Sequence, residues 1–127
     1  MSAPDLSVAA AKAFVPARDF ALSKRFYAAI GFEMVWASDA LAVFRHGAAG
    51  FMLQNFHIAE HSANFMMHLL VNDVDAWWQQ LQDKRIADEF NVKIGTPELR
   101  PWGQRDFTLF DPSGVLWRIG QHAAASA

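Results

Sequence analysis

The sequence contains no cysteine, so it offers no disulfide framework, no thiolate metal ligand and no cysteine nucleophile. It also carries little net charge, because 11 Lys and Arg residues face 13 Asp and Glu residues, which gives a formal charge of −2. This balance lacks the strongly basic surface that nucleic-acid binding requires, and we expect no nucleic-acid partner. The absence of cysteine fixes no compartment, but it suits the cytosol.

Long hydrophobic runs are missing as well. No segment approaches the roughly 18 apolar residues that a membrane-spanning helix needs. The N-terminal region carries Asp5 and lacks the basic start and apolar stretch of a signal peptide. We therefore expect a soluble cytoplasmic protein with no membrane partner. The length of 127 residues and the apolar content of 53% suit one compact domain with a sizeable core.

What the sequence does contain is the same order of elements twice. A short apolar run leads into a helical pattern at Asp19, and another does so at Asp73, 54 residues later. In the first half we expect the strand 13–19, the helix 19–32 and three strands at 32–37, 40–46 and 50–56. In the second half we expect the strand 65–73, the helix 73–86, a less regular segment 87–101 and a hairpin around the turn 111–114. This order predicts an α+β fold with helices on one face of a mixed sheet.

Three segments carry a resemblance to known proteins, namely "PARDFALSKRFYAAIGFEMVW", "HLLVNDVDAWWQQL" and "PWGQRDFTLFDPSGVLWRIGQ". Together they resemble the vicinal oxygen chelate superfamily of glyoxalase I, extradiol dioxygenases, fosfomycin-modifying enzymes and bleomycin resistance proteins. The last segment is most similar to the bleomycin resistance branch. The resemblance covers nearly all of residues 12–121. It implies one domain of two βαβββ modules, about 12–57 and 64–121, which form a cupped mixed sheet. It also implies a homodimer, in which the cleft often needs both chains.

Metal-using members of this superfamily place one ligand on the first strand and one on the last strand of each module. The resemblance puts these positions at Lys12, Gln54, Met66 and Arg118. Only Gln54 is an ordinary ligand, whereas Lys12 and Arg118 would repel a cation. A shift by two residues would bring His68 into the set, but one His and one Gln are too few for a tight site. We predict that the protein has no metal and no other cofactor.

Arg118 stands between Trp117 and Ile119 in a run that is otherwise apolar. One interpretation places it on the cleft side, held by a carboxylate or presented to an anionic or carbonyl-bearing ligand. The alternative is an edge arginine whose side chain extends into solvent. His68 likewise has two interpretations, as a general base or hydrogen-bond donor to ligand, or as an ordinary, partly buried histidine.

Aromatic residues supply the remaining site candidates. In the bleomycin resistance branch a Trp-Gly pair borders the ligand cleft, and Trp102 with Gly103 matches it. Further walls are expected from Trp36, Phe44 and Phe56, for which ordinary packing is the alternative. The predicted ligand-binding set is thus Trp36, Phe44, Gln54, Phe56, His68, Trp102 and Arg118, and no catalytic residue is assigned.

The other four histidines receive no site assignment, and His122, in the tail, is expected to be a surface residue. His57 and His61 are four residues apart, but the connecting segment lacks the helical flanks that a metal-binding pair needs, and a solvated linker is expected there. His46 stands beside a glycine and is expected to be a surface residue in a turn.

Two functions of different classes follow. The first is a metal-free, non-enzymatic protein that sequesters an aromatic or amphipathic drug or metabolite, as bleomycin resistance proteins do. The low net charge argues against bleomycin itself, which is cationic, and favours an anionic or neutral metabolite. The alternative is a glyoxalase- or dioxygenase-like lyase or transferase. A metal-free enzyme of this kind would use His68 as a base and Arg118 to stabilise an oxyanion.

Overall fold

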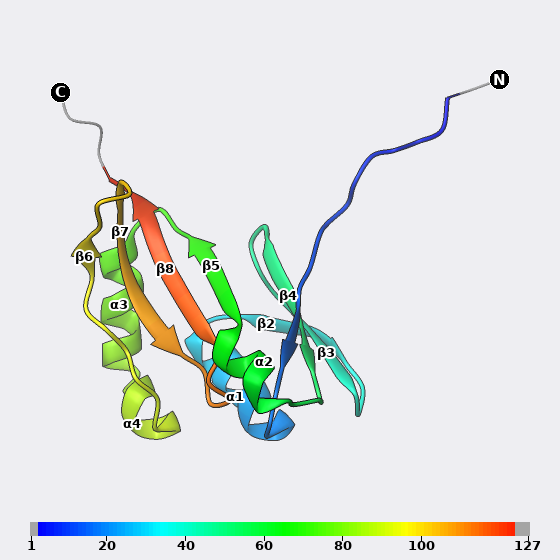
Figure 1. Ribbon diagram of the computed structural model, residues 1–127, viewed down its shortest axis with the longest axis horizontal. Helices are drawn as coiled ribbons and strands as arrows, with labels where there is room; N and C mark the ends of the chain where they lie inside the picture. The colour runs from blue at the N-terminus through cyan, green and yellow to red at the C-terminus, as the bar shows by residue number, and fades with distance from the viewer. Residues whose placement is uncertain (1–2, 124–127) are drawn as a thin grey trace.

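Two four-stranded sheets form the framework of the chain, which a computed structural model describes over residues 3–123 (Figure 1). Sheet 1 has the order β1-β4-β3-β2 and sheet 2 the order β5-β8-β7-β6. The strands of sheet 1 are β1 (Phe14–Pro16), β2 (Glu33–Ala37), β3 (Leu41–His46) and β4 (Ala49–Gln54). Those of sheet 2 are β5 (Met66–Leu70), β6 (Glu98–Leu99), β7 (Gln104–Phe110) and β8 (Leu116–His122). The outermost residues of the expected domain, 1–2 and 124–127, lie outside the described part.

The same strand arrangement occurs in both sheets, and the α+β prediction is confirmed. The first strand of each half runs parallel to the last, β1 beside β4 and β5 beside β8, while the remaining pairs are antiparallel. The helices are α1 (Phe20–Ile30), α2 (Ala59–Asn64), α3 (Val74–Asp83) and α4 (Ile86–Phe90). Helix α1 contacts β2 and β4, and α3 contacts β7 and β8, so each sheet has one long helix against it.

Both long helices begin at the aspartates that mark the repeat. The Asp19 carboxylate accepts a hydrogen bond from the Leu22 backbone N–H at 3.1 Å, and Asp73 accepts one from Ala76 N–H at 3.0 Å. Each aspartate therefore satisfies one of the backbone donors that a helix leaves unpaired in its first turn. Helix α1 ends at Gly31, whose φ of 120° ends the helix in a conformation that favours glycine.

Two expectations about the connecting segments were wrong. The expected linker after sheet 1 contains the six-residue helix α2, which carries His61. The expected helix 73–86 ends early, and α4 follows it after Arg85, which adopts the left-handed conformation with φ 54°. A non-glycine residue in that region is uncommon, so the sequence pattern did not predict this break.

The core lies between the helices and the covered faces of the sheets. Along β3, β4, β7 and β8 buried side chains alternate with partly exposed ones, as expected for sheets that have one covered face. We call the opposite, uncovered side of each sheet its open face. Within residues 3–123 no helix has the length and apolar character that crossing a membrane requires.

Candidate functional site

The open face of sheet 2 gathers polar side chains from three neighbouring strands. On β8, Trp117 and Ile119 are buried, and the alternation turns Arg118 to the open face. The strand register pairs Arg118 with His68 on β5 and with Thr108 on β7. These three side chains therefore form one row across the sheet, in which Arg118 is central.

Arg118 is held by a carboxylate that sequence analysis did not identify. Its Nη1 lies 3.4 Å from Asp106 Oδ2 and 3.5 Å from Asp106 Oδ1. The Asp106 side chain is completely buried, while 29% of the Arg118 side chain is exposed. Strand β8 lies inside sheet 2, between β5 and β7. These contacts favour the interpretation of a carboxylate-held arginine over that of an edge residue extending into solvent.

A second guanidinium shares the same carboxylate. Arg100 Nε donates a 2.7 Å hydrogen bond to Asp106 Oδ1, and its Nη1 donates one of 2.8 Å to Glu98 Oε2. The hydrogen bond to Asp106 is the main cause that raises the pKa of Arg100 above its ordinary value. Two arginines thus compensate the one buried charge, which would otherwise be costly to remove from water.

His68 bonds to a side chain of the neighbouring hairpin. Its Nε2 lies 2.9 Å from the Gln104 Oε1. Because an amide oxygen only accepts, Nε2 carries the proton and Nδ1 remains available to another partner. Gly120 makes the space for this contact, since a Cβ there would lie 2.9 Å from Gln104 Oε1 and 3.0 Å from Asp106 Cβ. This contact engages the donor nitrogen of an exposed His68, and it leaves both interpretations of the residue untested.

Trp102 covers the row from the turn between β6 and β7. The Arg118 Cζ lies 5.5 Å from the centroid of the Trp102 ring, within the range of a cation–π contact. Even so, 59% of Trp102 is exposed. The open face is bordered by other exposed apolar side chains, namely Met66, Leu70 and Phe110. Of the predicted set, the structure brings together His68, Trp102 and Arg118.

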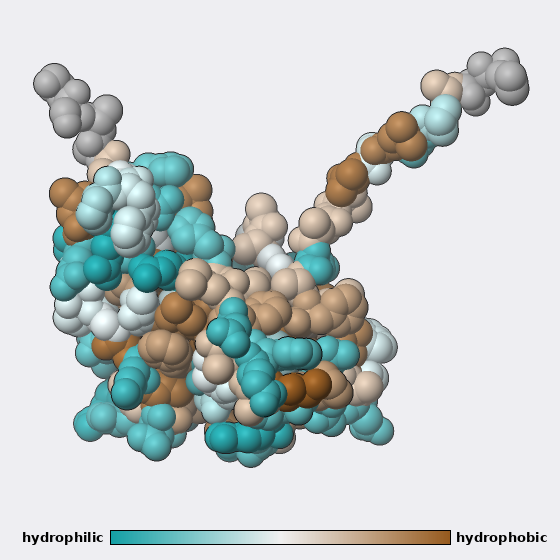
Figure 2. Space-filling view, viewed as in Figure 1, coloured by the Kyte–Doolittle hydropathy of each residue, from teal (hydrophilic) through white to brown (hydrophobic). Residues whose placement is uncertain are grey.

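The other predicted residues belong to sheet 1. A β-bulge between Met34 and Trp36 places Trp36 opposite Val43, on the open face. Trp36 is 55% exposed and Phe56 is 50% exposed. Gln54 lies at the end of β4, beside Pro16 of β1. Figure 2 shows hydrophobic surface gathered over the sheet 1 half of that view.

Phe44 was expected to form a ligand wall, and this expectation was wrong. Its side chain is completely buried and stacks on Phe51, with the ring centroids 5.4 Å apart and the planes at 12°. Alternation along β3 turns Phe44 and Ala42 toward the core and Val43 toward the open face. The bulge explains why Trp36 and Phe44, which looked equivalent, lie on opposite sides.

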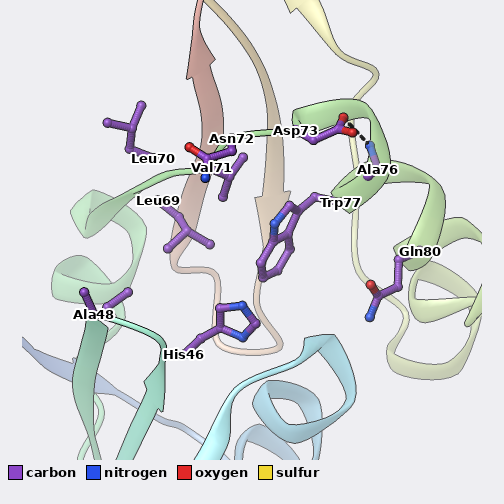
Figure 3. A pocket seen from close by; sticks show the side chains of 11 residues that line it. His46, Ala48, Leu69, Leu70, Val71, Asn72, Asp73, Ala76, Trp77 and Gln80 are labelled. Atoms are coloured by element: carbon purple, nitrogen blue, oxygen red, sulfur yellow. Dashed lines mark hydrogen bonds between the residues drawn. The ribbon is translucent and has the colours of Figure 1, made fainter.

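A separate cavity of about 460 Å³ lies where the β3–β4 turn meets the start of α3 (Figure 3). His46 lines it, at the end of β3 and exposed, as a surface residue was expected to be. Its Nδ1 lies 2.9 Å from the Gly31 carbonyl oxygen, and its ring meets the Trp77 ring edge-on at 5.1 Å. None of the predicted ligand-binding residues lines this cavity.

Comparison with known proteins decides the family. The sequence profile of the Glyoxalase/Bleomycin resistance protein/Dioxygenase superfamily matches residues 9–119. The chain belongs to this superfamily. A bleomycin resistance protein from Klebsiella pneumoniae is 27% identical over 113 residues, which cover 85% of this chain and 88% of the relative.

Solved structures of the superfamily share the fold. A bleomycin-binding protein complexed with bleomycin superposes with a TM-score of 0.77 at 24% identity, covering 91% of this chain and 99% of the other. The bleomycin-binding protein from bleomycin-producing Streptomyces verticillus, complexed with copper(II)-bleomycin, gives 0.75 at 20%, covering 95% and 100%. These likenesses confirm the predicted fold, whereas the ligands belong to those proteins.

The residues at the superfamily's metal positions do not fit a divalent metal. Lys12 precedes β1 and lies beside Gly50, and Arg118 is already engaged by Asp106 and Trp102. Met66 offers only a thioether, which suits soft metals, so Gln54 is the one oxygen donor. Within residues 3–123 no three His, Cys, Asp or Glu side chains are grouped closely enough to hold an ion.

Proposed function

We propose that this protein binds an aromatic or amphipathic small molecule on the open face of sheet 2 and releases it unchanged. The observation that carries the proposal is Trp102, a large aromatic side chain that is 59% exposed yet held over the Arg118 guanidinium. A flat, exposed aromatic ring stacks on a planar ligand, and its few side-chain torsions keep the cost in conformational entropy small. The exposed apolar side chains of Met66 and Phe110 would add contact area around it.

Membership of the superfamily supports a binding role, since relatives include a bleomycin resistance protein and bleomycin-binding proteins. We do not extend their ligand to this chain. The net charge of −2 provides little attraction for a strongly cationic drug, and Arg118 places positive charge beside the stacking surface. The proposed ligand is a neutral or anionic aromatic compound.

We propose that binding needs neither a metal nor a catalytic residue. The donor set at the superfamily's metal positions is dominated by Lys12 and Arg118, which repel cations. His68, the one candidate base on this face, is hydrogen-bonded to the neutral Gln104 amide, and no carboxylate is paired with it among the described residues. A histidine base usually relies on a carboxylate that orients and stabilises its protonated form.

A second copy of the chain is proposed to cover the open face of sheet 1. One apolar row crosses that face from Trp36 through Val43 and Met52 to Phe14. Trp36 and Phe14 are each about half exposed in the single chain. Contiguous apolar surface of this kind is typical of protein interfaces. The homodimer expected from the superfamily resemblance would bury this row.

The proposal is tested by calorimetric titration with naphthalene-2-carboxamide, a neutral aromatic probe. Because an aromatic pair contributes about 0.5–1.5 kcal/mol beyond its area, Trp102→Ala should weaken binding about twofold to twelvefold. Trp102→Phe should retain most of the affinity. Met34→Ala removes another exposed apolar side chain, on the α1 side of β2, and should leave binding unchanged.

Two results would contradict the proposal. One is no binding of the probe at millimolar concentration, and the other is equal affinity in the wild type and the Trp102→Ala variant. The proposal that the ligand is released unchanged is tested by mass spectrometry of the bound compound after long incubation. A changed mass would favour the enzyme alternative.

A further inference from the structure

Arg118 has less compensation than the other arginine of the same face. Arg100 bonds to two carboxylates, at 2.7 Å to Asp106 and at 2.8 Å to Glu98. Arg118 has Asp106 alone, at 3.4 and 3.5 Å. Charge-assisted hydrogen bonds between guanidinium and carboxylate groups are ordinarily about 2.7–2.9 Å long. Asp106 therefore forms a short hydrogen bond with Arg100 and only long ones with Arg118.

The remaining donors of Arg118 are available at the open face. Only Nη1 has a hydrogen-bond partner among residues 3–123, and the side chain is 29% exposed. The guanidinium lies between Trp102 and Asp106, and its contacts with both limit its orientation. A guanidinium held in this way keeps its planar fork of N–H groups oriented, so a ligand need not order it.

We infer that this face selects aromatic ligands that bear a carboxylate, and that Arg118 binds the carboxylate while Trp102 stacks on the ring. The inference rests on the proposed function and names the ligand class of that site. A carboxylate matches the fork of a guanidinium with two parallel hydrogen bonds. An aryl group attached to it comes to lie next to Trp102, because Trp102 is already within 5.5 Å of Arg118.

His68 adds a second polar contact on the same side. It lies directly beside Arg118 in the β5–β8 register, and its Nε2 is taken by Gln104. With the proton on Nε2, Nδ1 is an acceptor, so it binds a hydroxyl or amide donor of the ligand and not its carboxylate. A ligand cation, by contrast, would meet the positive charge of Arg118, while Asp106 is completely buried and Glu98 is bonded to Arg100.

The test compares three naphthalene probes of one shape and different charge, namely naphthalene-2-carboxylate, naphthalene-2-carboxamide and naphthalen-2-ylmethylammonium. The structure predicts the order carboxylate, amide, ammonium from tightest to weakest. The carboxylate should bind about tenfold more tightly than the amide, near the lower end expected for a hydrogen bond to a charged group at a partly exposed site. Raising the salt concentration should reduce that advantage.

Substitutions of Arg118 test whether this residue causes the preference for the carboxylate probe. Arg118→Gln should bring the carboxylate to the affinity of the amide, and Arg118→Lys should keep part of the preference because the cation remains. Arg105→Gln is the matched control, since Arg105 is a strand arginine paired with Asp75 toward α3. It should leave all three affinities unchanged. Amide binding by each variant also shows that the variant is folded.

The outcomes separate this inference from the proposed function. Equal binding of carboxylate and amide, or tighter binding of the ammonium, with Trp102→Ala still weakening both, would overturn the carboxylate selection alone. A carboxylate preference that survives Arg118→Gln would overturn it too. Loss of all binding, or insensitivity to Trp102→Ala, would overturn the proposed function itself.

Discussion

The Tyr27 hydroxyl donates a 2.6 Å hydrogen bond to Asp111 Oδ2, and it accepts one of 3.0 Å from Trp117 Nε1. Tyr27 belongs to α1 of the first half, whereas Asp111 and Trp117 belong to the β7–β8 hairpin of the second. All three side chains are buried. This chain of hydrogen bonds therefore joins the two halves through the core.

Tyr27→Phe should lower the free energy of unfolding by about 1–3 kcal/mol. The change keeps the ring but leaves a buried carboxylate oxygen and a buried indole N–H without their partner, and unsatisfied buried groups cost about that much. Urea unfolding followed by circular dichroism measures it. Phe20→Leu, on the same helix and only partly buried, is the control. Equal midpoints for wild type and Tyr27→Phe would show that the bridge contributes nothing.

Alkaline pH offers a second test, because Tyr27 is the only tyrosine of the chain. Burial, followed by the charge of Asp111, raises the pKa of Tyr27 well above its ordinary value of 10.0. The folded state thus holds this proton more tightly than the unfolded state does, so the stabilisation is complete below pH 10.0 and is lost as the pH rises further.

Phenolate absorbance should accordingly appear only where circular dichroism shows unfolding, with the two transitions at the same pH. Free tyrosine amide, titrated in parallel, gives the unperturbed reference. Ionisation of Tyr27 near pH 10.0 in a protein that remains folded would contradict the burial argument.

Gly120→Ala should disturb the contact between Gln104 and His68 and lower the stability of the protein. The new Cβ would meet Gln104 Oε1 at 2.9 Å and Asp106 Cβ at 3.0 Å, so Gln104 must move away from His68. Overpacking of this kind costs about 1–3 kcal/mol of stability. In the Gln104→Ala background part of the clash is absent, and the same substitution should cost less. An identical loss of stability in both backgrounds would show that the new Cβ does not clash with Gln104.

Trp36→Glu should convert the proposed dimer into a monomer, because it replaces the largest side chain of the apolar row by a charge that the interface would bury. Analytical ultracentrifugation of the wild type and the variant measures the change. Met34→Glu is the control, since Met34 lies on the same strand but beside α1. A monomeric wild type at micromolar concentration would remove the homodimer from the account.

The sequence was sufficient for the order of the main strands and for the starts of the two long helices, whereas α2 and α4 were missed. Asp19 and Asp73 each precede a helical pattern, and a cap is a local interaction between a side chain and the backbone three residues on. The alternation around Arg118 likewise indicated its face, because strand neighbours point to opposite sides.

The contacts of the site residues depend on the register in which the strands pair, and this register could not be predicted from the sequence. A bulge shifts β2 by one residue, so Trp36 faces out while Phe44 of the next strand faces in. Asp106 could be suspected from its place in an otherwise alternating strand, but its sharing between Arg100 and Arg118 depends on how β6, β7 and β8 pair.

The most direct test of the central claim is a nuclear magnetic resonance titration of the five indole N–H signals with naphthalene-2-carboxamide. Each signal is assigned by replacing one tryptophan at a time. The account predicts a saturable shift of the Trp102 signal, with an affinity equal to that from calorimetry, while the Trp77 signal stays in place. A stationary Trp102 signal together with a moving Trp77 signal would mean that the ligand occupies the cavity beside His46, and would contradict the claim.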